Sequence, residues 1–464
     1  MKSFTSRIGL TSKSSSSAPK ESASKLPVIS SSAKPVVVAR VSPPIAAAPA
    51  APVSANGGRV VEPQKWIVGK QYPVIPGELF YMSIRNEAKL RELQDWQREN
   101  GVNVDRVFVT APEELQYFPF CADFGPMNFG MTYRFVDMLN EALGQARKLG
   151  KKIVYYCSAD PAERTNAATL IAAYLVLDRG WTPEEAIAPL SFVGRQPFLP
   201  YRDASFQPVI FELAIIDILR GLRKAVDLKI IKMKSFDLEF YEHCDHPSMA
   251  DLHEIIPGKF VAMKGPHTKS YYKDGVQFLA PSHYFELFKR LGVTAVVRLN
   301  DEQYPAKAFT DVGIHHHDIY FDDCTVPNVS VVNRWFEMCR EEKGSIAVHC
   351  KAGLGRTGTL ICLWMMRKWK FTGRECIGYI RTIRPGSILG PQQEYLLEME
   401  QTMHAMGDPD TETGRLKDGA ASRMSAEEEA REKAKEQQRA AAARTLAQEN
   451  TDAMNRRAAT MNQR

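Results

Sequence analysis

The sequence lacks the marks of a disulfide-stabilised or membrane-spanning protein. Its eight cysteines are scattered over 464 residues and form no Cys-x-x-Cys pair, so neither a disulfide framework nor a zinc site is indicated. The longest near-apolar stretch, residues 167–177, is too short to span a bilayer. The N-terminus has no apolar segment of secretory length, and Lys2 stands where myristoylation needs glycine. We therefore expect a chain of the cytoplasm or the nucleus.

The chain also lacks a surplus of charge in its main part. Its formal net charge is +6, and residues 1–64, with eight Lys/Arg and two acids, carry all of it. The remaining 400 residues hold 52 basic and 52 acidic side chains, so they offer no basic face for nucleic acid. Residues 1–64 are rich in Ser, Ala, Pro and Val, which predicts a disordered basic tail. Within it, Ser42 before Pro43 is a candidate site of proline-directed phosphorylation.

Order is expected from about residue 66 to residue 401, and this part contains an internal repeat. Residues 153–157 and 346–350 each have the pattern of a short strand ending in cysteine, followed by an Arg-Thr pair and a Thr-Leu-Ile segment. Thirteen residues after each Thr-Leu-Ile threonine, Thr182 or Thr372 opens a Thr-x-x-Glu segment, which predicts the N-cap of a second helix. The repeat predicts two related α/β domains, each with a strand–loop–helix centre.

The first copy has lost the features of an anion site. Six residues separate Cys157 from Arg164, and the loop between them contains Asp160, Pro161 and Glu163. Acidic side chains would repel phosphate, and a proline removes an N–H donor. We interpret Cys157 as a structural remnant.

The second copy keeps those features. Cys350 and Arg356 flank five residues between a predicted strand and a predicted helix, namely Lys351, Ala352, Gly353, Leu354 and Gly355. Unpaired N–H groups converge at such a helix N-terminus and favour an anion. A cysteine there is expected as a thiolate, with a pKa of roughly 3.5–7.5. The arginine fork matches two phosphate oxygens. Together these features predict phosphoryl transfer to Cys350, with the five loop residues binding the phosphate.

The reaction needs an acid for the leaving oxygen and a group that positions water. The best candidate acid is Asp323, which follows the predicted strand 319–321. Gln392, with its neighbour Gln393, could hold the water, although a helix start after Pro391 explains these glutamines equally well. Thr357 is expected to donate a hydrogen bond to the Cys350 sulfur.

No metal or other cofactor is required by this chemistry. The histidines 315–317 form a tempting cluster with Asp318. Consecutive residues of a strand point to alternate faces, so these three cannot all ligate one ion. His349 also lies on a strand that alternates, and we expect it to order the loop through hydrogen bonds rather than transfer protons.

Several motifs together resemble a known family. The pattern His349-Cys350-x5-Arg356-Thr357 is the signature of the protein tyrosine phosphatase superfamily. The longer run 349–361 resembles the Cdc-fourteen (mitotic-exit) dual-specificity phosphatases. Further segments similar to that family are 122–126, 202–206, 241–243, 296–300, 384–388 and 390–393. The resemblance covers roughly residues 66–400 and is more specific than the signature loop alone.

The resemblance implies an α/β protein with two tandem dual-specificity-phosphatase-like domains, each a central mixed sheet flanked by helices. The expected division is a tail at 1–64, an inactive domain at 65–210, a linker helix and connection at 211–254, a catalytic domain at 255–402, and a charged, helical tail at 403–464. It implies Cys350 as nucleophile, Arg356 as phosphate clamp and Asp323 as general acid.

The resemblance also implies a substrate class. Phosphoproteins are the expected partners, with phosphoserine before proline and a nearby basic residue preferred over other phosphoserine, phosphothreonine or phosphotyrosine sites. Glu242 matches the acidic groove that reads the basic residue, and Asp203 and Asp251 are candidate neighbours. A salt bridge from Asp203 to Arg202 or to another basic residue is an equal alternative. A role in mitotic exit or cytokinesis is implied, and the tails could bind cytoskeletal or nuclear partners, for example at the spindle pole or centrosome.

The chain departs from the family pattern in its tails and in Cys324, which stands in the acid loop where glycine is usual. Two other functions compete with the main one. Phosphoinositide phosphatases share the loop but tend to carry a second lysine where Leu354 stands. A pseudophosphatase scaffold is disfavoured because Cys350, Arg356 and Asp323 are all intact.

Overall fold

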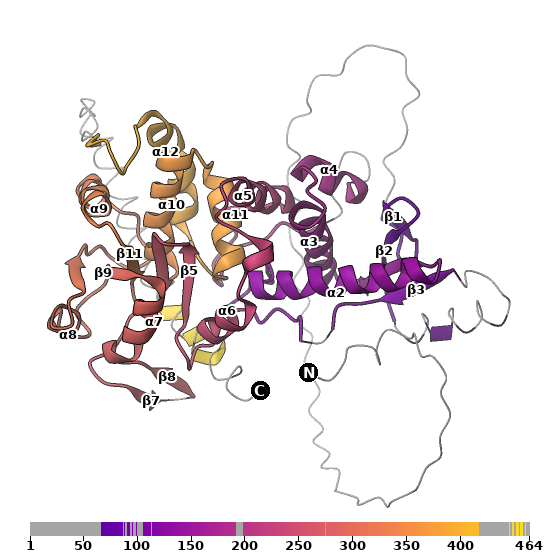
Figure 1. Ribbon diagram of the computed structural model, residues 1–464, viewed down its shortest axis with the longest axis horizontal. Helices are drawn as coiled ribbons and strands as arrows, with labels where there is room; N and C mark the ends of the chain where they lie inside the picture. Colours follow the sequence, from indigo (N-terminus) through magenta and orange to yellow (C-terminus); the bar gives the residue numbers. More distant parts are fainter. Residues whose placement is uncertain are drawn as a thin grey trace, which may run out of the picture. The chain divides into compact units, whose positions relative to one another are not determined.

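The computed structural model describes residues 66–416, except for several positions between 87 and 104 and for 113, 192–197 and 274, together with scattered positions between 445 and 460. The chain divides into the units Met1–Gln64 and Lys65–Arg464. The predicted N-terminal tail, with Ser42, and most of the predicted C-terminal helix lie outside the described residues. Two sheets organise the second unit, each with its own helices (Figure 1).

The N-terminal sheet has four strands in the order β1-β2-β4-β3. Their bounds are β1 (Tyr72–Ile75), β2 (Leu79–Ile84), β3 (Arg106–Val109) and β4 (Lys152–Ser158). β1 pairs antiparallel with β2, whereas β2 and β3 pair parallel with β4. The helices are α2 (Phe129–Lys148), α3 (Pro161–Leu177) and α4 (Pro183–Ile187), with α2 and α3 packed on β4.

The C-terminal sheet has five strands in the order β10-β9-β11-β6-β5. The bounds are β5 (Leu252–Ile256), β6 (Phe260–Met263), β9 (Val293–Arg298), β10 (His315–Asp318) and β11 (Ser345–His349). Only β5 is antiparallel to its neighbour. All five residues of β11 are buried, as expected for a central parallel strand with both faces covered. A separate hairpin joins β7 (Tyr271–Lys273) to β8 (Val276–Phe278).

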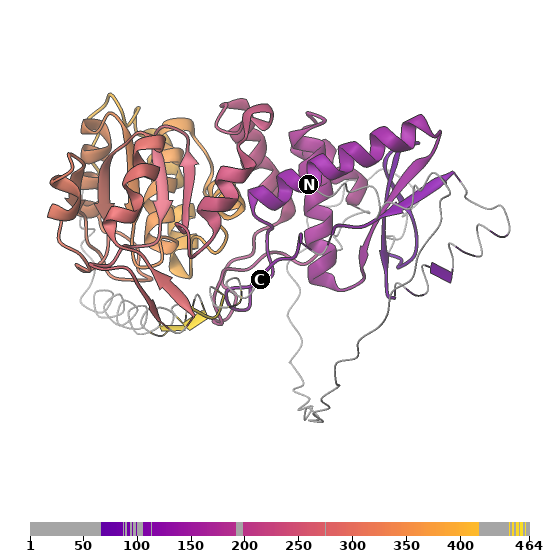
Figure 2. The ribbon, with the colours of Figure 1, turned by 60° about the horizontal axis from the view of Figure 1, so that its bottom comes forward.

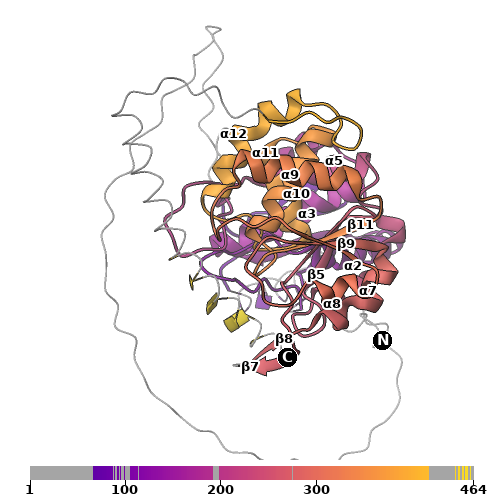
Figure 3. The ribbon, with the colours of Figure 1, turned by 90° about the vertical axis from the view of Figure 1, so that its left-hand side faces the viewer.

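Helices cover both faces of this sheet, as Figure 3 shows. One face carries α9 (Val329–Glu341), α10 (Gly355–Trp369), α11 (Gly373–Ile383) and α12 (Pro391–Ala405), and the other carries α7 (Phe285–Leu291) and α8 (Lys307–Thr310). The remaining helices are α5 (Ile215–Asp227) and α6 (Leu238–Asp245). Among the described residues, no helix is both long enough and apolar enough to span a membrane.

The two sheets confirm the internal repeat. The order β1-β2-β4-β3 matches β5-β6-β11-β9, in strand direction as well as in sequence order, and β10 is an added edge strand. Each central strand, β4 or β11, runs through a loop into a long helix, α3 or α10. Thr182 and Thr372 both form the predicted capping boxes, with Glu185 and Glu375 respectively. The chain thus contains two copies of one α/β unit, visible as separate groups of elements in Figure 2.

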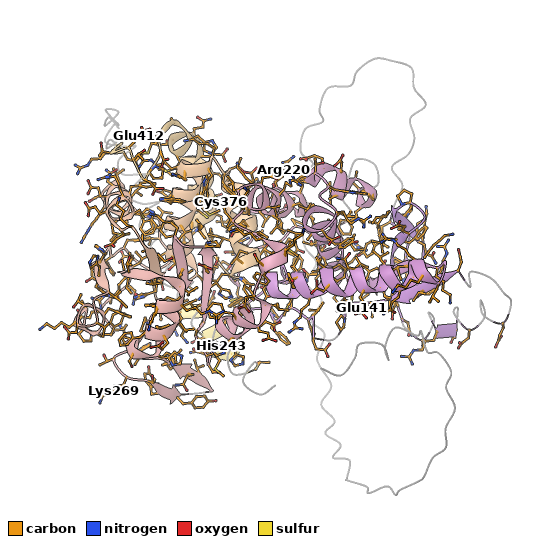
Figure 4. All side chains as sticks on the ribbon, in the orientation of Figure 1. Glu141, Arg220, His243, Lys269, Cys376 and Glu412 are labelled. Carbon is orange, nitrogen blue, oxygen red and sulfur yellow. The ribbon has the colours of Figure 1, made fainter. Side chains whose placement is uncertain are left out.

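Close packing of α5 against α11 connects the two copies. A Cβ on Gly221 of α5 would collide with the Glu375 carbonyl oxygen, and one on Gly378 of α11 would lie 2.8 Å from the Ile218 Cα. The two glycines therefore let the helix backbones approach closely. Figure 4, which draws side chains on the whole ribbon, labels Arg220 on α5 and Cys376 on α11.

One predicted strand is displaced. The strand before the acid loop is His315–Asp318, not 319–321. Apolar composition favoured the later residues, yet Ile319 and Phe321 continue only single backbone hydrogen bonds, to the carbonyls of Arg298 and Leu299. The chain leaves the sheet there because it turns into the loop that carries Asp323.

Candidate active site

The loop between β11 and α10 forms the floor of the site. β11 ends at His349, Cys350 follows with 2 % of its surface exposed, and α10 begins at Gly355. Gly353 has a φ of +66°, and a Cβ there would collide with the carbonyl of Met263. Only glycine fits this turn without strain. The loop therefore brings its N–H groups to the start of α10, above a buried thiol.

Arg356 lines the same site as Cys350, and hydrogen bonds to two backbone carbonyls fix its guanidinium. Its Nη1 donates to the carbonyls of Leu299 (3.1 Å) and Phe321 (2.8 Å), and its Nη2 lies 3.1 Å from Asp323 Oδ1. Among the described residues, the buried Arg356 Nε has no hydrogen-bond partner. An unpaired buried N–H on a positive group is costly, and a phosphate oxygen would satisfy it.

Thr357 does not form its predicted hydrogen bond to the Cys350 sulfur. Its Oγ1 is buried and has no hydrogen-bond partner within the described part of the chain. The hydroxyl sits in the first turn of α10, close in sequence to the loop but unengaged. Its role toward the leaving thiolate stays a prediction.

Asp323 lies in a loop with a strained backbone. Its Oδ1 accepts a hydrogen bond from the Cys324 N–H at 3.1 Å, in addition to the ion pair with Arg356. Cys324 has a φ of +58°, a conformation that costs less for glycine. Its buried side chain packs in a cluster with Phe120 and Leu354. Side-chain burial thus offsets the strain of a cysteine at a position suited to glycine.

Gln392 connects α12 to the same acid loop. Its Oε1 accepts from the Leu389 N–H at 3.0 Å, and its Nε2 donates to the Thr325 carbonyl at 3.1 Å. The helix start at Pro391 is also confirmed. Gln393 instead bonds Arg381 and the Gly390 carbonyl. Gln392 is therefore the glutamine near the reacting groups, and in this state its amide holds the acid loop.

Arg384 braces the loop from below, a role that the sequence did not reveal. Its Nε donates to the Gly353 carbonyl at 2.8 Å and its Nη2 donates to the Ala352 carbonyl at 2.9 Å. The same guanidinium pairs with Asp251 Oδ1 at 2.8 Å and lies 2.9 Å from His253 Nδ1. Because the two loop carbonyls point at Arg384, the loop N–H groups are free to point the other way.

A second brace runs through buried hydrogen bonds behind Cys350. His349 Nδ1 donates to the Cys350 carbonyl at 3.0 Å, and Tyr304 lies 2.7 Å from His349 Nε2 and 3.0 Å from His316 Nε2. Burial lowers the pKa of His349 to about 3 and that of His316 to about 4. Both rings are therefore neutral, and the expected ordering role of His349 is confirmed. The periodicity of the sequence gave no sign of Tyr304.

These groups open on one cleft. Its lining includes Cys350, Arg356, Asp323 and Gln392, together with the loop residues Lys351, Ala352, Leu354 and Gly355. Phe120 and Ala204, from the N-terminal copy, form part of its wall. The cleft thus combines a thiol, a guanidinium, a carboxylic acid and an apolar wall.

Comparisons with known proteins agree with this geometry. Residues 73–225 match the family described as the N-terminal half of dual specificity protein phosphatases, and residues 278–402 match the dual specificity phosphatase catalytic domain. Human CDC14C is 39% identical over 301 residues, which cover 65% of this chain and 67% of that protein. The chain belongs to the CDC14 family of dual specificity phosphatases.

Other members of the family are similar to the chain at comparable identity. Mouse CDC14A is 43% identical over 330 residues, covering 71% of this chain and 53% of that protein. The CDC14 tyrosine-protein phosphatase of Saccharomyces cerevisiae is 39% identical over 298 residues, covering 62% of this chain and 54% of that protein. The chain therefore spans about half the length of several curated relatives.

The acidic residues that the family resemblance nominated do not converge on one point. Glu242 on α6 forms an ion pair with Arg134. Asp203 is buried and accepts hydrogen bonds from the Gly390 N–H (2.8 Å) and the Ser205 hydroxyl (3.1 Å). The alternative pairing of Asp203 with Arg202 is also absent in the described structure, because Arg202 donates to backbone carbonyls. Asp203 instead ties the N-terminal copy to the start of α12.

Of the three nominated acidic residues, Asp251 is the one that lies beside the cleft. Together with Asp245 it lines a small pocket that adjoins Leu354 and Arg384. Burial raises the pKa of the Asp245 carboxyl, but the hydrogen bond from His253 (2.8 Å) and the positive charges nearby together outweigh burial, so the pKa is lowered. Burial lowers the pKa of His253, which favours its neutral form. The pocket therefore keeps negative charge on Asp245, a residue that the sequence did not single out.

Described residues of the C-terminal segment contact this same region. Arg457 places its guanidinium 3.8 Å from the centroid of the Phe120 ring and lines the pocket with Asp245. Asn455 lines the catalytic cleft, and Glu449 accepts a hydrogen bond from Gln207 at 3.0 Å. A basic side chain of the C-terminal segment thus lines the small pocket beside the cleft, together with Asp245 and Asp251.

The corresponding loop in the first copy has no such site. The Cys157 sulfur lies 3.1 Å from the Tyr81 hydroxyl, and burial raises the pKa of its thiol to about 12. Asp160 caps α3 by accepting from the N–H groups of Ala162 and Glu163. A carboxylate therefore fills the position where a phosphate would need those donors. These contacts support the interpretation of Cys157 as a structural remnant.

Proposed function

We propose that the chain is a cysteine-dependent protein phosphatase that hydrolyses phosphoserine, and also phosphothreonine and phosphotyrosine, through a phosphocysteine intermediate. The observation that carries this proposal is the shared cleft of Cys350, Arg356 and Asp323, in which the buried Arg356 Nε has no partner among the described residues. A phosphate dianion supplies the acceptor and the charge that this position lacks.

In the first half-reaction the Cys350 thiolate attacks phosphorus and the bond from phosphorus to the substrate oxygen breaks. The loop N–H groups and Arg356 bind the equatorial oxygens, where negative charge is spread in the transition state. Asp323 gives its proton to the leaving serine oxygen. To reach the leaving oxygen, Asp323 must give up its ion pair with Arg356. The incoming phosphate replaces Asp323 as the partner of the Arg356 guanidinium.

In the second half-reaction water displaces the sulfur. Asp323, now a carboxylate, accepts a proton from that water, the new P–O bond forms, and the S–P bond breaks to return the thiolate. We expect Gln392 to orient this water once the acid loop moves and releases its Nε2 from the Thr325 carbonyl.

We further propose a preference for phosphoserine followed by proline, with a basic residue nearby. Apolar side chains of Phe120, Leu354 and Leu389 cluster at the cleft and suit a proline ring. The position of Arg457 beside Asp245 supports a subsite for a lysine or arginine of the substrate. Asp251 and Glu242 are weaker candidates for this subsite, because Arg384 already pairs with Asp251 and Arg134 with Glu242.

Short phosphopeptides test the proposal. We expect kcat/KM to fall at least about tenfold, equivalent to about 1.4 kcal/mol, when the proline or the following basic residue is replaced by alanine. Asp245→Asn is expected to reduce the effect of the basic residue while leaving turnover of para-nitrophenyl phosphate unchanged. Equal rates for all peptides would refute the preference.

Two further measurements test the activity itself. We expect faster hydrolysis of phosphopeptides than of phosphoinositides, because Leu354, 4 % exposed and packed against Phe120, stands where a lipid phosphatase tends to carry a second lysine. The opposite result would indicate a lipid substrate. The wild type should release a burst of product from an aryl phosphate, and Cys350→Ser should not. No turnover by the wild type would indicate a scaffold.

For the cellular role we propose dephosphorylation of proline-directed kinase sites during mitotic exit or cytokinesis. The proposal follows from family membership, and the basic N-terminal tail is a candidate for directing the chain to nuclear or cytoskeletal partners. A substrate-trapping Asp323→Ala variant, used as bait in dividing cells, should retain proteins phosphorylated at Ser-Pro sites. Recovery only of proteins without such sites would contradict the role.

A further inference from the structure

Two histidines and a glutamate meet at the edge of the C-terminal sheet, away from the catalytic loop. His315 and His317 are at positions i and i+2 of the edge strand β10, so both side chains leave the same face. Glu342 follows the last residue of α9. His315 Nδ1 and His317 Nε2 each lie 2.8 Å from the same oxygen, Glu342 Oε1.

The strand alternation that excluded three consecutive histidines as ligands is what brings these two together. His316 points to the opposite face, where its Nε2 lies near the Tyr304 hydroxyl. The third ligand comes from a helix that the sequence pattern did not connect with this strand. The three candidate ligand atoms lie within 4.8 Å of one another.

We propose that His315, His317 and Glu342 bind a divalent transition-metal ion, with Zn²⁺ as the preferred occupant. Two imidazole nitrogens and one carboxylate oxygen are ligands that Zn²⁺ takes at about 2.0–2.2 Å, with a fourth position left for water. Ligands at these distances stand about 3.3 Å apart in a tetrahedron, so the side chains need to separate by about half an ångström.

The burial of the carboxylate favours this occupant. The side chain of Glu342 is 8 % exposed, whereas those of His317 and His315 are 29 % and 68 % exposed. A buried carboxylate needs a compensating positive charge, which a metal ion supplies while both imidazoles stay neutral.

Binding exchanges protons for the metal. Each imidazole must present a lone pair from the nitrogen that now faces Glu342, so its proton moves to the other ring nitrogen, and any second proton is released to solvent. The bonds that form are two N–Zn bonds and one O–Zn bond, and no group is oxidised or reduced.

The position of the cluster defines what the metal would stabilise. β10 leads into the loop of Asp323, and that loop leads into α9, which ends directly before Glu342. The metal would therefore join the two ends of the segment 315–342, which carries the acid loop. We expect the ion to stabilise this crossover rather than take part in the reaction.

Zinc titration of the full chain tests the proposal. The measurements use Cys350→Ser protein, so that the catalytic thiolate does not bind the ion. We expect one equivalent of Zn²⁺ to bind by calorimetry and to raise Tm, and Co²⁺ to give the visible absorption of a four-coordinate site. His317→Ala and Glu342→Gln should weaken Zn²⁺ binding at least tenfold, whereas His243→Ala on α6 (Figure 4) should not.

A loss of binding could also come from a folding defect. His317→Ala and Glu342→Gln are therefore compared only if the circular dichroism spectrum of each variant matches that of the Cys350→Ser protein. Absence of zinc binding to the Cys350→Ser protein overturns the proposal and leaves a hydrogen-bonded His-Glu-His cluster. Equal affinity in His317→Ala and Glu342→Gln also overturns it and places the bound ion elsewhere.

Discussion

Replacing Arg384 by lysine tests whether this guanidinium holds the phosphate-binding loop in shape. The side chain is 2 % exposed. It contacts the carbonyls of Gly353, Ala352 and Asp251, the Asp251 carboxylate and His253 Nδ1, at 2.8 to 3.2 Å. A lysine ammonium has three donors and no planar fork. At least two of these five acceptors therefore lose their partner.

The size of the effect follows from burial. Each buried acceptor left without a partner costs about 1–3 kcal/mol, so we expect Arg384→Lys to lower the free energy of unfolding by about 2–6 kcal/mol. The carbonyls of Gly353 and Ala352 would also be free to turn, and the loop N–H groups would lose their common direction. We expect kcat/KM for para-nitrophenyl phosphate to fall by at least about tenfold.

Urea unfolding, monitored by fluorescence, measures the change in the free energy of unfolding. Steady-state kinetics measure the change in kcat/KM. Arg220→Lys is the matched control, because Arg220 pairs with Glu184 on the surface, where the two side chains are 48 % and 59 % exposed (Figure 4). An exposed pair contributes about 0.2–1 kcal/mol, so the control should stay within that range at unchanged turnover. Wild-type stability and turnover in Arg384→Lys would refute the proposed brace.

Three further predictions concern other parts of the molecule. Asp323→Asn should lower kcat for alkyl phosphates by about 10²–10⁴-fold, measured at saturating substrate, and an unchanged rate would remove Asp323 from the reaction. Cys157→Ser should leave turnover unchanged, because burial raises the pKa of this thiol to about 12; a large loss in a stably folded variant would contradict its role as a remnant. Deleting residues 417–464 should lower KM for a basic phosphopeptide several-fold, since Arg457 lines the pocket beside the cleft, together with Asp245. Arg457→Ala should have the same effect, and unchanged KM in both would show that the segment does not compete with substrate.

Local chemistry explains why so much of the site was visible in the sequence. The loop residues, the nucleophile and Arg356 are contiguous, so their spacing alone specifies a strand, an anion-binding turn and a helix start. Asp323 was predictable for a weaker reason, as an acid that follows a strand. The capping boxes of Thr182 and Thr372 are equally local, and the structure confirms both.

Contacts between distant segments were not visible in this way. Arg384 lies 31 residues from the Gly353 carbonyl that it holds, and Tyr304 lies 45 residues from His349. No spacing rule connects such partners, because they meet only when the helices and strands pack. For the same reason the sequence could not show that Glu242 would form an ion pair with Arg134.

The sequence by itself determined the chemistry of the loop and the doubling of the fold. Both are periodic or contiguous patterns, which local backbone geometry turns directly into structure. Tertiary structure decided which charges are already paired and which remain for a ligand. It left Arg356 Nε without a partner among the described residues, paired Asp251 with Arg384, and brought Glu342 to two histidines of β10. Pairing and burial depend on the packing of segments far apart in the chain, and they decide where a phosphate, a basic side chain or a metal ion can bind.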